Sequence, residues 1–219
     1  MANQRKYFFT GALMVFALAG MVVSVRHFRP PISKSGSDNL KVKGPDHAPI
    51  HMVVYSDFQC PACRSAREPI EALRNQFSDA IRLEFRHYPL ERNHRWAAVA
   101  AGFAECAAQQ GKFWEFHDRL FQEQATWSAS NEAVLFFAET AQGLQLDRGK
   151  LEICLKNPET ISRIRRERSM GERQKVQSTP TIFINDRILV GAGQLKEQGS
   201  LIVEEELKQL NEGKAAKSS

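Results

Sequence analysis

Cysteine is scarce in this sequence, with four residues in a chain of 219. That density is too low for a small domain held together by disulfides, and the chain is long enough to bury a hydrophobic core without them. No segment recurs at a fixed spacing, which argues against a solenoid. Hydrophobic residues make up 42% and charged residues 25% of the chain, so the composition is that of a folded protein rather than a disordered one.

The body of the chain also lacks an excess of positive charge, although the formal net charge of the whole chain is +5. Seven of the 30 basic side chains and one of the 25 acidic side chains precede residue 46. The remaining residues therefore carry 23 basic and 24 acidic side chains, a net charge of −1. A nucleic-acid-binding protein is expected to carry positive charge on its fold, so we do not expect a nucleic-acid partner.

An uncharged and largely apolar segment runs from Tyr7 to Val25. As a helix it would be about 28 Å long, enough to cross the hydrocarbon core of a bilayer. Residues 17–19 instead have the A-x-A pattern of a signal-peptide cleavage site. We expect residues 1–29 to be a signal anchor or a signal peptide, and we favour the anchor because the apolar run continues past Ala19. A buried core helix is a third alternative, but a helix that is apolar on all sides does not fit that role here.

The hydrophobic pattern of the body predicts strands and helices in a mixed order. The β-branched, apolar centre of Pro49–Phe58 predicts a buried strand. A helix is expected from Cys60 to about Phe77, with proline tolerated in its first turn. The alternation in Ile81–Tyr88 predicts a second strand, and helical spacing then dominates from Asn93 to Gln177.

Two short strands, Thr181–Ile184 and Ile188–Val190, and an amphipathic helix over Leu195–Leu210 complete the expected elements. Strands separated by helices imply a sheet with helical layers, so we expect an α/β fold interrupted by an all-helical subdomain. The expected segments are a linker at 30–45, the first part of the α/β domain at 46–92, the helical insertion at 93–177, the second part of the domain at 178–211 and a polar tail at 212–219.

The sharpest chemical signal is the C-x-x-C motif formed by Cys60, Pro61, Ala62 and Cys63, which follows a predicted strand and opens a predicted helix. A thiol at a helix N-terminus faces unpaired backbone N–H groups and the positive end of the helix dipole, and both favour the thiolate. The thiolate is the form that attacks disulfides. We therefore expect Cys60 to be the nucleophile and Cys63, one turn later, to resolve the mixed disulfide.

A zinc site and an inert structural disulfide are the alternatives for this cysteine pair. Structural zinc takes four ligands, and the sequence has no second C-x-x-C motif. A purely structural disulfide would not require this placement between a strand and a helix. We expect no metal or other cofactor. Four histidines are scattered along the body, where we expect surface or strand-end positions: His51, His87, His94 and His117.

Four stretches together resemble the DsbA-type thiol–disulfide oxidoreductases, in particular their exported or membrane-tethered, BdbD-like branch. The resemblance covers most of residues 42–211 and implies a thioredoxin fold with an inserted all-helical subdomain. This agrees with the order of elements predicted above. The stretches that carry the resemblance are Asp46–Cys63, Phe85–Leu90, Gln110–Phe116 and Ser178–Asn185.

The resemblance also implies roles for residues near the cysteine pair. It implies that Pro180 follows a cis peptide bond and packs against Cys60 and Cys63. It implies further that Thr179 offers backbone hydrogen bonds to a bound polypeptide. We expect Phe58 to belong to the core, with an edge on the substrate groove.

Two positions depart from the family pattern. Many relatives have His as the third residue of the motif, where this chain has Ala62. Thioredoxins and some DsbA-type proteins have a buried acid six residues before the first cysteine, where this chain has Val54. Strong oxidising power and the usual proton acceptor are therefore not implied. Glu84 and Asp57 are candidate replacements for that acceptor, although charged residues at strand ends are more commonly exposed.

Cys106 and Cys154 each lie on an apolar stretch of the predicted helical block. One interpretation is two buried free thiols, because free cysteine packs as a small hydrophobic residue. In an exported protein a structural disulfide between them is favoured, and some DsbA-type relatives resemble this arrangement. Such a bridge would stabilise the protein by about 2–4 kcal/mol.

The favoured function is a thiol–disulfide oxidoreductase of the bacterial cell envelope that introduces disulfides into reduced, exported polypeptides through Cys60 and Cys63. A DsbB-like, quinone-coupled membrane oxidase would reoxidise the pair. Residues 7–25, if uncleaved, would anchor the body on the periplasmic or extracytoplasmic side of the inner membrane. Two alternatives stay open: a disulfide isomerase or reductase on the same fold, and a non-enzymatic tethered module that binds peptides beside Pro180.

Overall fold

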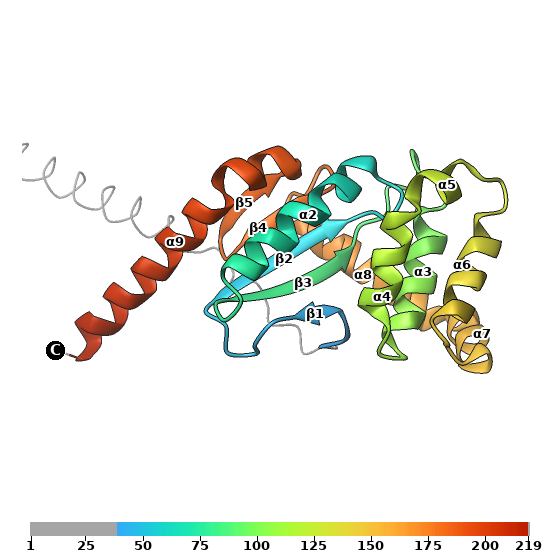
Figure 1. The fold of residues 1–219 in the computed structure, drawn as a ribbon, viewed down its shortest axis with the longest axis horizontal. Helices are drawn as coiled ribbons and strands as arrows, with labels where there is room; N and C mark the ends of the chain where they lie inside the picture. Colours follow the sequence, from blue (N-terminus) through green and yellow to red (C-terminus); the bar gives the residue numbers. More distant parts are fainter. Residues whose placement is uncertain (1–38, 219) are drawn as a thin grey trace, which may run out of the picture. The chain divides into compact units, whose positions relative to one another are not determined.

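The computed structural model describes residues 39–218, and a five-stranded mixed sheet forms the centre of this part of the chain (Figure 1). The order of the strands in the sheet is β1-β3-β2-β4-β5. Strands β2 and β3 pair in parallel and the other neighbours pair antiparallel. The strands are β1 Val42–Lys43, β2 Ile50–Ser56, β3 Ile81–His87, β4 Thr181–Ile184 and β5 Arg187–Val190.

Helix α2, Pro61–Gln76, connects β2 to β3, and helix α9, Gly191–Ser218, follows β5. The two helices pack against each other on one face of the sheet (Figure 1). Their apolar side chains join alternate residues of β2 and β4 in one core, because successive strand residues point to opposite faces. Helix α8, Pro158–Arg173, lies against β3 and covers the other face, where Tyr55 and Phe183 stack edge to face.

The helical insertion lies beyond the carboxyl ends of β2 and β3 (Figure 1). Its core is aromatic and includes Phe103, Phe116, Trp127 and Phe137. The same core extends to Phe85 of β3 and to both cysteines of the C-x-x-C motif. The predicted α/β class with an inserted all-helical subdomain is therefore confirmed. The inserted helices before α8 are α3 Ala97–Ala108, α4 Phe113–Gln122, α5 Gln124–Ala129, α6 Ala133–Gly143 and α7 Arg148–Lys156.

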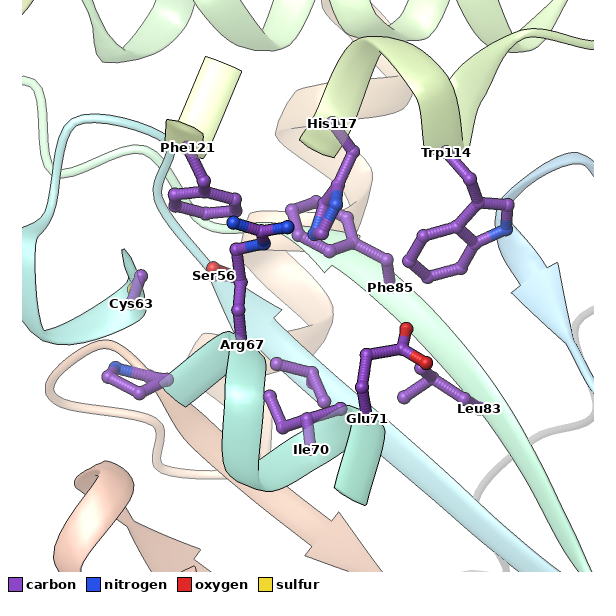
Figure 2. A pocket seen from close by; sticks show the side chains of 12 residues that line it. Ser56, Cys63, Arg67, Ile70, Glu71, Leu83, Phe85, Trp114, His117 and Phe121 are labelled. Atoms are coloured by element: carbon purple, nitrogen blue, oxygen red, sulfur yellow. The ribbon is translucent and has the colours of Figure 1, made fainter. Parts of the chain in front are cut away.

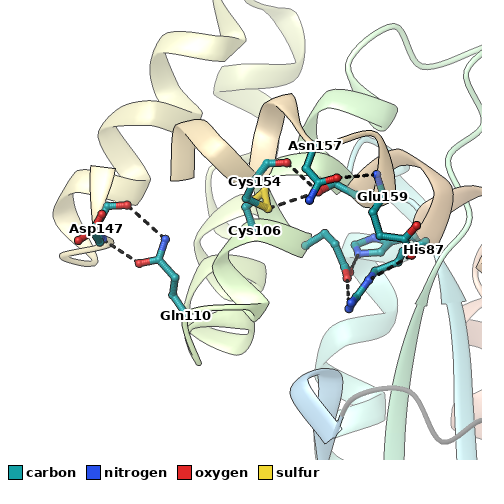
Figure 3. Close-up of a disulfide and its surroundings, with 10 residues drawn as sticks. His87, Cys106, Gln110, Asp147, Cys154, Asn157 and Glu159 are labelled. Carbon is teal, nitrogen blue, oxygen red and sulfur yellow. Dashed lines mark hydrogen bonds and ion pairs between the residues drawn. A yellow bond between two sulfur atoms is a disulfide. The ribbon is translucent and has the colours of Figure 1, made fainter. Parts of the chain in front are cut away.

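A disulfide joins Cys106 of α3 to Cys154 of α7, with an S–S distance of 2.04 Å and a Cα–Cα distance of 5.7 Å (Figure 3). Both sulfurs are buried in the insertion core. The same two helices are held together at the surface by Gln110, which accepts from the backbone N–H of Asp147 at 2.8 Å and donates to its carbonyl at 3.3 Å. The insertion thus has a covalent and a hydrogen-bonded connection across the same pair of helices.

The segment predicted as a linker is part of the fold over its last residues, so the prediction for 30–45 is wrong there. Residues Asn39–Lys41 form a 3-10 helix, and β1 pairs with β3. Lys41 is only 6% exposed. Its ammonium group makes ion pairs with Glu105 at 2.8 Å and with Glu167. A buried carboxylate of α3 and a partly buried carboxylate of α8 therefore hold this segment, which sequence composition alone does not indicate.

The C-terminal polar segment predicted from Glu212 is helical as far as it is described, because α9 continues to Ser218. No proline interrupts this stretch, and Lys208 and Glu212 form an i,i+4 ion pair of 4.0 Å along it. Within residues 39–218 no helix combines the length and the hydrophobicity that a membrane crossing requires. The predicted anchor at residues 7–25 lies outside the described residues.

Candidate redox site

The C-x-x-C motif lies where the sheet, α2 and the helical insertion meet. Cys60 is the N-cap of α2 and Pro61 is its first residue, so the local geometry is the one the sequence predicts. Both cysteines are free thiols, with Cys60 7% and Cys63 2% exposed. The backbone N–H groups of Cys63 and Arg64 donate to the Cys60 carbonyl at 3.1 and 3.2 Å, which closes the first turn.

The two thiols have very different acidities. A hydrogen bond from the Cys63 thiol lowers the pKa of Cys60 to about 5. The neighbouring Thr179 and the backbone N–H groups of Cys63 and Ala62 lower this pKa further, so that the opposing effect of burial is outweighed. Burial raises the pKa of Cys63 well above its ordinary value, and the neighbouring Cys60 raises it further. Cys60 is therefore a thiolate near neutral pH while Cys63 keeps its proton.

The peptide bond between Thr179 and Pro180 is cis and lies beside the motif. When Cys60 is protonated, its Sγ donates to the Thr179 carbonyl at 3.4 Å. Thr181, the first residue of β4, donates from Oγ1 to the Ser178 carbonyl at 2.7 Å and so fixes the turn that contains the proline. The two sequence elements, 119 residues apart, thus form one site.

A glutamine from the insertion holds the loop that precedes α2. Nε2 of Gln124, which is buried at the start of α5, donates to the carbonyls of Phe58 and Cys60 at 2.8 and 2.9 Å. Gln59 completes the connection by accepting from the backbone N–H of Trp96 at 2.8 Å. Sequence reasoning missed Gln124, because no motif or spacing connects it with the cysteines.

Asp57, proposed above as a proton acceptor, is buried but already has three donors. Its carboxylate accepts from the backbone N–H groups of Gln59 and Leu90 at 2.7 and 2.8 Å and is 2.7 Å from Nδ1 of His94. Its contact with Cys63 is through the backbone, which donates to Sγ at 3.5 Å. Asp57 therefore shapes the loop.

Three aromatic side chains near the motif are buried, and of these His117, inside α4, is the one that lies away from its predicted surface or strand-end position. The Phe58 ring is 1% exposed and stacks on Phe85, which confirms its predicted place in the core, and its contact with a substrate stays a prediction. His87 and His117 are also buried, because both rings pack among the phenylalanines where the insertion meets the sheet. Burial lowers the pKa of each of these histidines.

A small cavity lies behind Cys63, between α2, β3 and α4 (Figure 2). Its volume of about 20 Å³ is enough for one water molecule. Apolar side chains dominate its wall, including that of Val54. The polar and reactive side chains that line it are Ser56, Cys63, Arg67, Glu71 and His117.

The described residues contain no group of three or more His, Cys, Asp or Glu side chains arranged to hold a metal ion. The chemistry that their geometry supports at Cys60 and Cys63 is thiol–disulfide exchange, which needs only a stabilised thiolate and a second thiol in reach.

The Cys60 thiolate gives a direct test of this geometry. We expect the ultraviolet absorbance of the thiolate in the reduced protein to titrate with a midpoint near pH 5. The hydrogen bond from Cys63 is the largest contribution to the lowered pKa of Cys60. Cys63→Ala should therefore raise the midpoint, and Cys63→Ser, which keeps a donor, should raise it less. An unchanged midpoint in Cys63→Ala would contradict this explanation.

The fold and the paired cysteines define the class of this protein as a thioredoxin fold with a C-x-x-C pair at the start of a helix. The sequence model of a family described as thioredoxin matches residues 38–204, and the chain belongs to that family.

Solved structures agree with the predicted DsbA-type fold. BdbD from Bacillus subtilis superposes with a TM-score of 0.67 at 21% identity, over 77% of this chain and 92% of that one. The α-DsbA1 protein of Wolbachia pipientis superposes with a TM-score of 0.66 at 20% identity, over 78% of this chain and 94% of that one. DsbA2 from Pseudomonas aeruginosa superposes with a TM-score of 0.60 at 25% identity, over 76% of this chain and 92% of that one.

Curated relatives are much longer than this chain. A protein named Na(+)/H(+) antiporter NhaA 3 from Salinispora tropica is 33% identical over 184 residues, which are 80% of this chain and 27% of that protein. An antiporter NhaA 1 from Salinispora arenicola is 34% identical over 171 residues, 78% of this chain and 25% of the relative. The chain spans about a quarter of the length of these relatives.

Proposed function

We propose that this protein is a disulfide donor that oxidises reduced polypeptides outside the cytoplasm. The substrate thiolate attacks Cys60 of the oxidised pair, Cys63 leaves, and a second substrate thiol displaces Cys60 from the mixed disulfide. The substrate thereby gains a disulfide and the cysteine pair is left reduced.

The observation that carries this proposal is the stabilised thiolate of Cys60. A pKa of about 5 means that the reduced form of the pair is stabilised at neutral pH. A dithiol whose reduced form is stabilised has a disulfide that readily oxidises other thiols, as in DsbA. Thr179 and Pro180, beside Cys60, are the residues we propose to contact the substrate backbone.

The reduction potential of the Cys60–Cys63 pair tests the direction of exchange. After equilibration of the protein in glutathione buffers, we expect a value near that of DsbA, about −120 mV. A value near that of thioredoxin, about −270 mV, would contradict disulfide donation and favour the reductase or isomerase. The buried Cys106–Cys154 bridge is an internal control that should stay oxidised throughout.

We further propose that residues 7–25 direct the chain to the cell envelope and anchor it there, and that a DsbB-like, quinone-coupled membrane oxidase reoxidises Cys60 and Cys63. The supporting feature in the sequence is the apolar run that precedes the family region. A disulfide between Cys106 and Cys154 also suits an oxidising compartment. We do not extend ion transport to this chain, because the relatives named for it are about three times as long.

A further inference from the structure

The proposed exchange, on which this inference rests, requires a proton to move on and off Cys63. Cys63 is a buried thiol, and burial raises its pKa well above the ordinary value. It must lose its proton to attack the mixed disulfide at Cys60, and it must regain one when it leaves. A nearby group that exchanges protons would therefore speed both directions.

The position of Val54 and the two carboxylates that the sequence suggested, Asp57 and Glu84, do not supply such a group. Val54 lines the cavity behind Cys63 and has no ionisable atom. The Asp57 carboxylate is turned toward three donors, from Gln59, Leu90 and His94. Glu84 pairs with His51 and Arg86 at 2.9 and 2.7 Å and is not part of the cavity wall.

His117 is the titratable ring on the cavity wall, opposite the helix that carries Cys63. Figure 2 shows its ring extending from α4 toward Arg67 of α2. The Nδ1 atom of His117 lies 2.9 Å from an oxygen of Asp118, and Arg67 donates to the same oxygen at 3.3 Å. Burial alone would raise the pKa of Asp118, but hydrogen bonding to His117 and the charges of Lys43 and Arg67 lower it. Asp118 is therefore a carboxylate, so Nδ1 donates and Nε2 of the neutral ring is the proton acceptor.

Asp118 also gives the histidine a route to solvent. The His117 ring is enclosed by Phe121 and Trp114, each with its ring centre 5.0 Å away, whereas the Asp118 side chain is 47% exposed. Arg67 Nε is buried and has no hydrogen-bond partner among the described residues, and Arg67 lines the same cavity. The cavity is therefore large enough for one water molecule and is lined by the Cys63 thiol, by Arg67 with its unsatisfied Nε donor, and by His117. His117 in turn pairs with Asp118, whose side chain is half exposed.

We propose that His117, held by Asp118, exchanges the proton of Cys63 through a water molecule in this cavity. When Cys63 resolves a mixed disulfide, its S–H proton passes through the water to Nε2. The Cys63 sulfur then forms a bond to Cys60 Sγ, the bond from Cys60 to the partner sulfur breaks, and the partner leaves with the electron pair. In disulfide donation the same steps run in reverse, and Cys63 leaves as a thiolate that takes the proton.

The charge around His117 favours the neutral ring in which Nε2 accepts. The charged and titratable groups near it are Asp118 on its own helix, Arg67 and Glu71 on α2 and Lys43 on β1, and His87 on β3 packs against the same Phe58 ring. Lys43 and Glu71 neutralise each other in an ion pair of 2.7 Å. Burial lowers the pKa of His117, and the positive charges of Arg67 and Lys43 act in the same direction against Asp118.

The test separates the two chemical steps. Reduced protein is mixed with glutathione disulfide, and samples are quenched with acid to measure the Cys60–glutathione mixed disulfide by mass spectrometry. In His117→Phe, whose ring suits the aromatic surroundings, we expect the mixed disulfide to form at the wild-type rate. Its resolution by Cys63 should slow at least about tenfold at neutral pH and recover as the pH rises and hydroxide replaces the base.

Two further variants keep the result decisive. Asp118→Asn removes the carboxylate from a half-exposed position without altering the ring, and it should slow resolution and shift its pH profile even if His117→Phe fails to fold. His51→Gln, on β2 and outside the cavity, should match the wild type. Wild-type resolution kinetics at every pH in both His117→Phe and Asp118→Asn would overturn this proposal alone. Failure of the wild-type Cys60–Cys63 pair to become oxidised by glutathione disulfide at all would overturn the proposed function with it.

Discussion

Replacement of Cys60 by serine is expected to abolish disulfide exchange, and Cys63→Ala is expected to trap mixed disulfides with substrate. The Cys60 thiolate is the stabilised nucleophile at the N-terminus of α2, and a serine hydroxyl at the same place stays protonated and unreactive toward disulfides. Without Cys63 the second thiol that releases Cys60 is missing. Oxidation of a reduced, unfolded polypeptide, followed on non-reducing gels, measures both effects.

The control for this experiment is the double variant Cys106→Ala/Cys154→Ala. Its bridge lies inside the insertion core, so exchange should persist in the fraction of protein that stays folded. Full oxidase activity in Cys60→Ser would contradict the proposed function. Unchanged function in the cell after replacement of both Cys60 and Cys63 would instead favour the non-enzymatic peptide-binding module.

Lys41→Met is expected to destabilise the fold by about 3–5 kcal/mol, because it leaves a buried carboxylate and a partly buried one without their cation. Lys41 pairs with Glu105 and Glu167, and the Glu105 side chain is almost completely buried. Burial would raise the pKa of Glu105, but His87 and Lys41 together lower it far below its ordinary value. Urea unfolding of the two proteins measures the loss.

The pH dependence of this loss has a defined sign. A carboxyl whose pKa is lowered by folding adds stability above its unfolded pKa, and that stability is lost as the pH falls toward the folded value. The free energy of unfolding of the wild type should therefore decrease as the pH falls below about 4.5. The difference in this free energy between the wild type and Lys41→Met should shrink in the same range, because Glu105 becomes protonated. Adding Glu105→Gln to Lys41→Met should restore part of the stability.

Lys43→Met is the matched control, two residues along the chain. Lys43 pairs with Glu71 nearer the surface, with both side chains partly exposed. Exposed ion pairs contribute about 1 kcal/mol or less, so this variant should stay close to the wild type. Equal losses in the two lysine variants would contradict a special role for the buried cluster.

Elements and their order were predictable from the sequence because they depend on local patterns. The alternation of Ile81–Tyr88 corresponds to β3 at Ile81–His87, and the apolar run Thr181–Ile184 is β4 without change. Pro61 after Cys60 marked the start of α2 correctly. Each of these signals lies within a few neighbouring residues, where strand alternation or a helix-start preference acts directly.

The surroundings of the site depend on contacts between residues far apart in the sequence. Gln124 is 64 residues from Cys60, and Lys41 is 126 residues from Glu167. Neither contact has a periodic signature in the sequence. This explains why the predicted linker extends past Asn39 into the fold and why the sequence does not indicate Gln124. The burial of Phe58 and His117 has the same origin, because the insertion closes over the ends of β2 and β3 only in the folded chain.

Local sequence patterns are enough to specify a cysteine pair at a helix N-terminus, the strands that position it and a helical insertion, because each follows from residues close together in the chain. The side chains that surround that pair depend on contacts formed in the folded chain. Packing of the insertion against the sheet buries Cys63 and forms a cavity behind it. The same packing brings His117 to the wall of this cavity, which Val54 also lines. The environment of the cysteine pair is thus set by long-range packing, which local patterns do not encode.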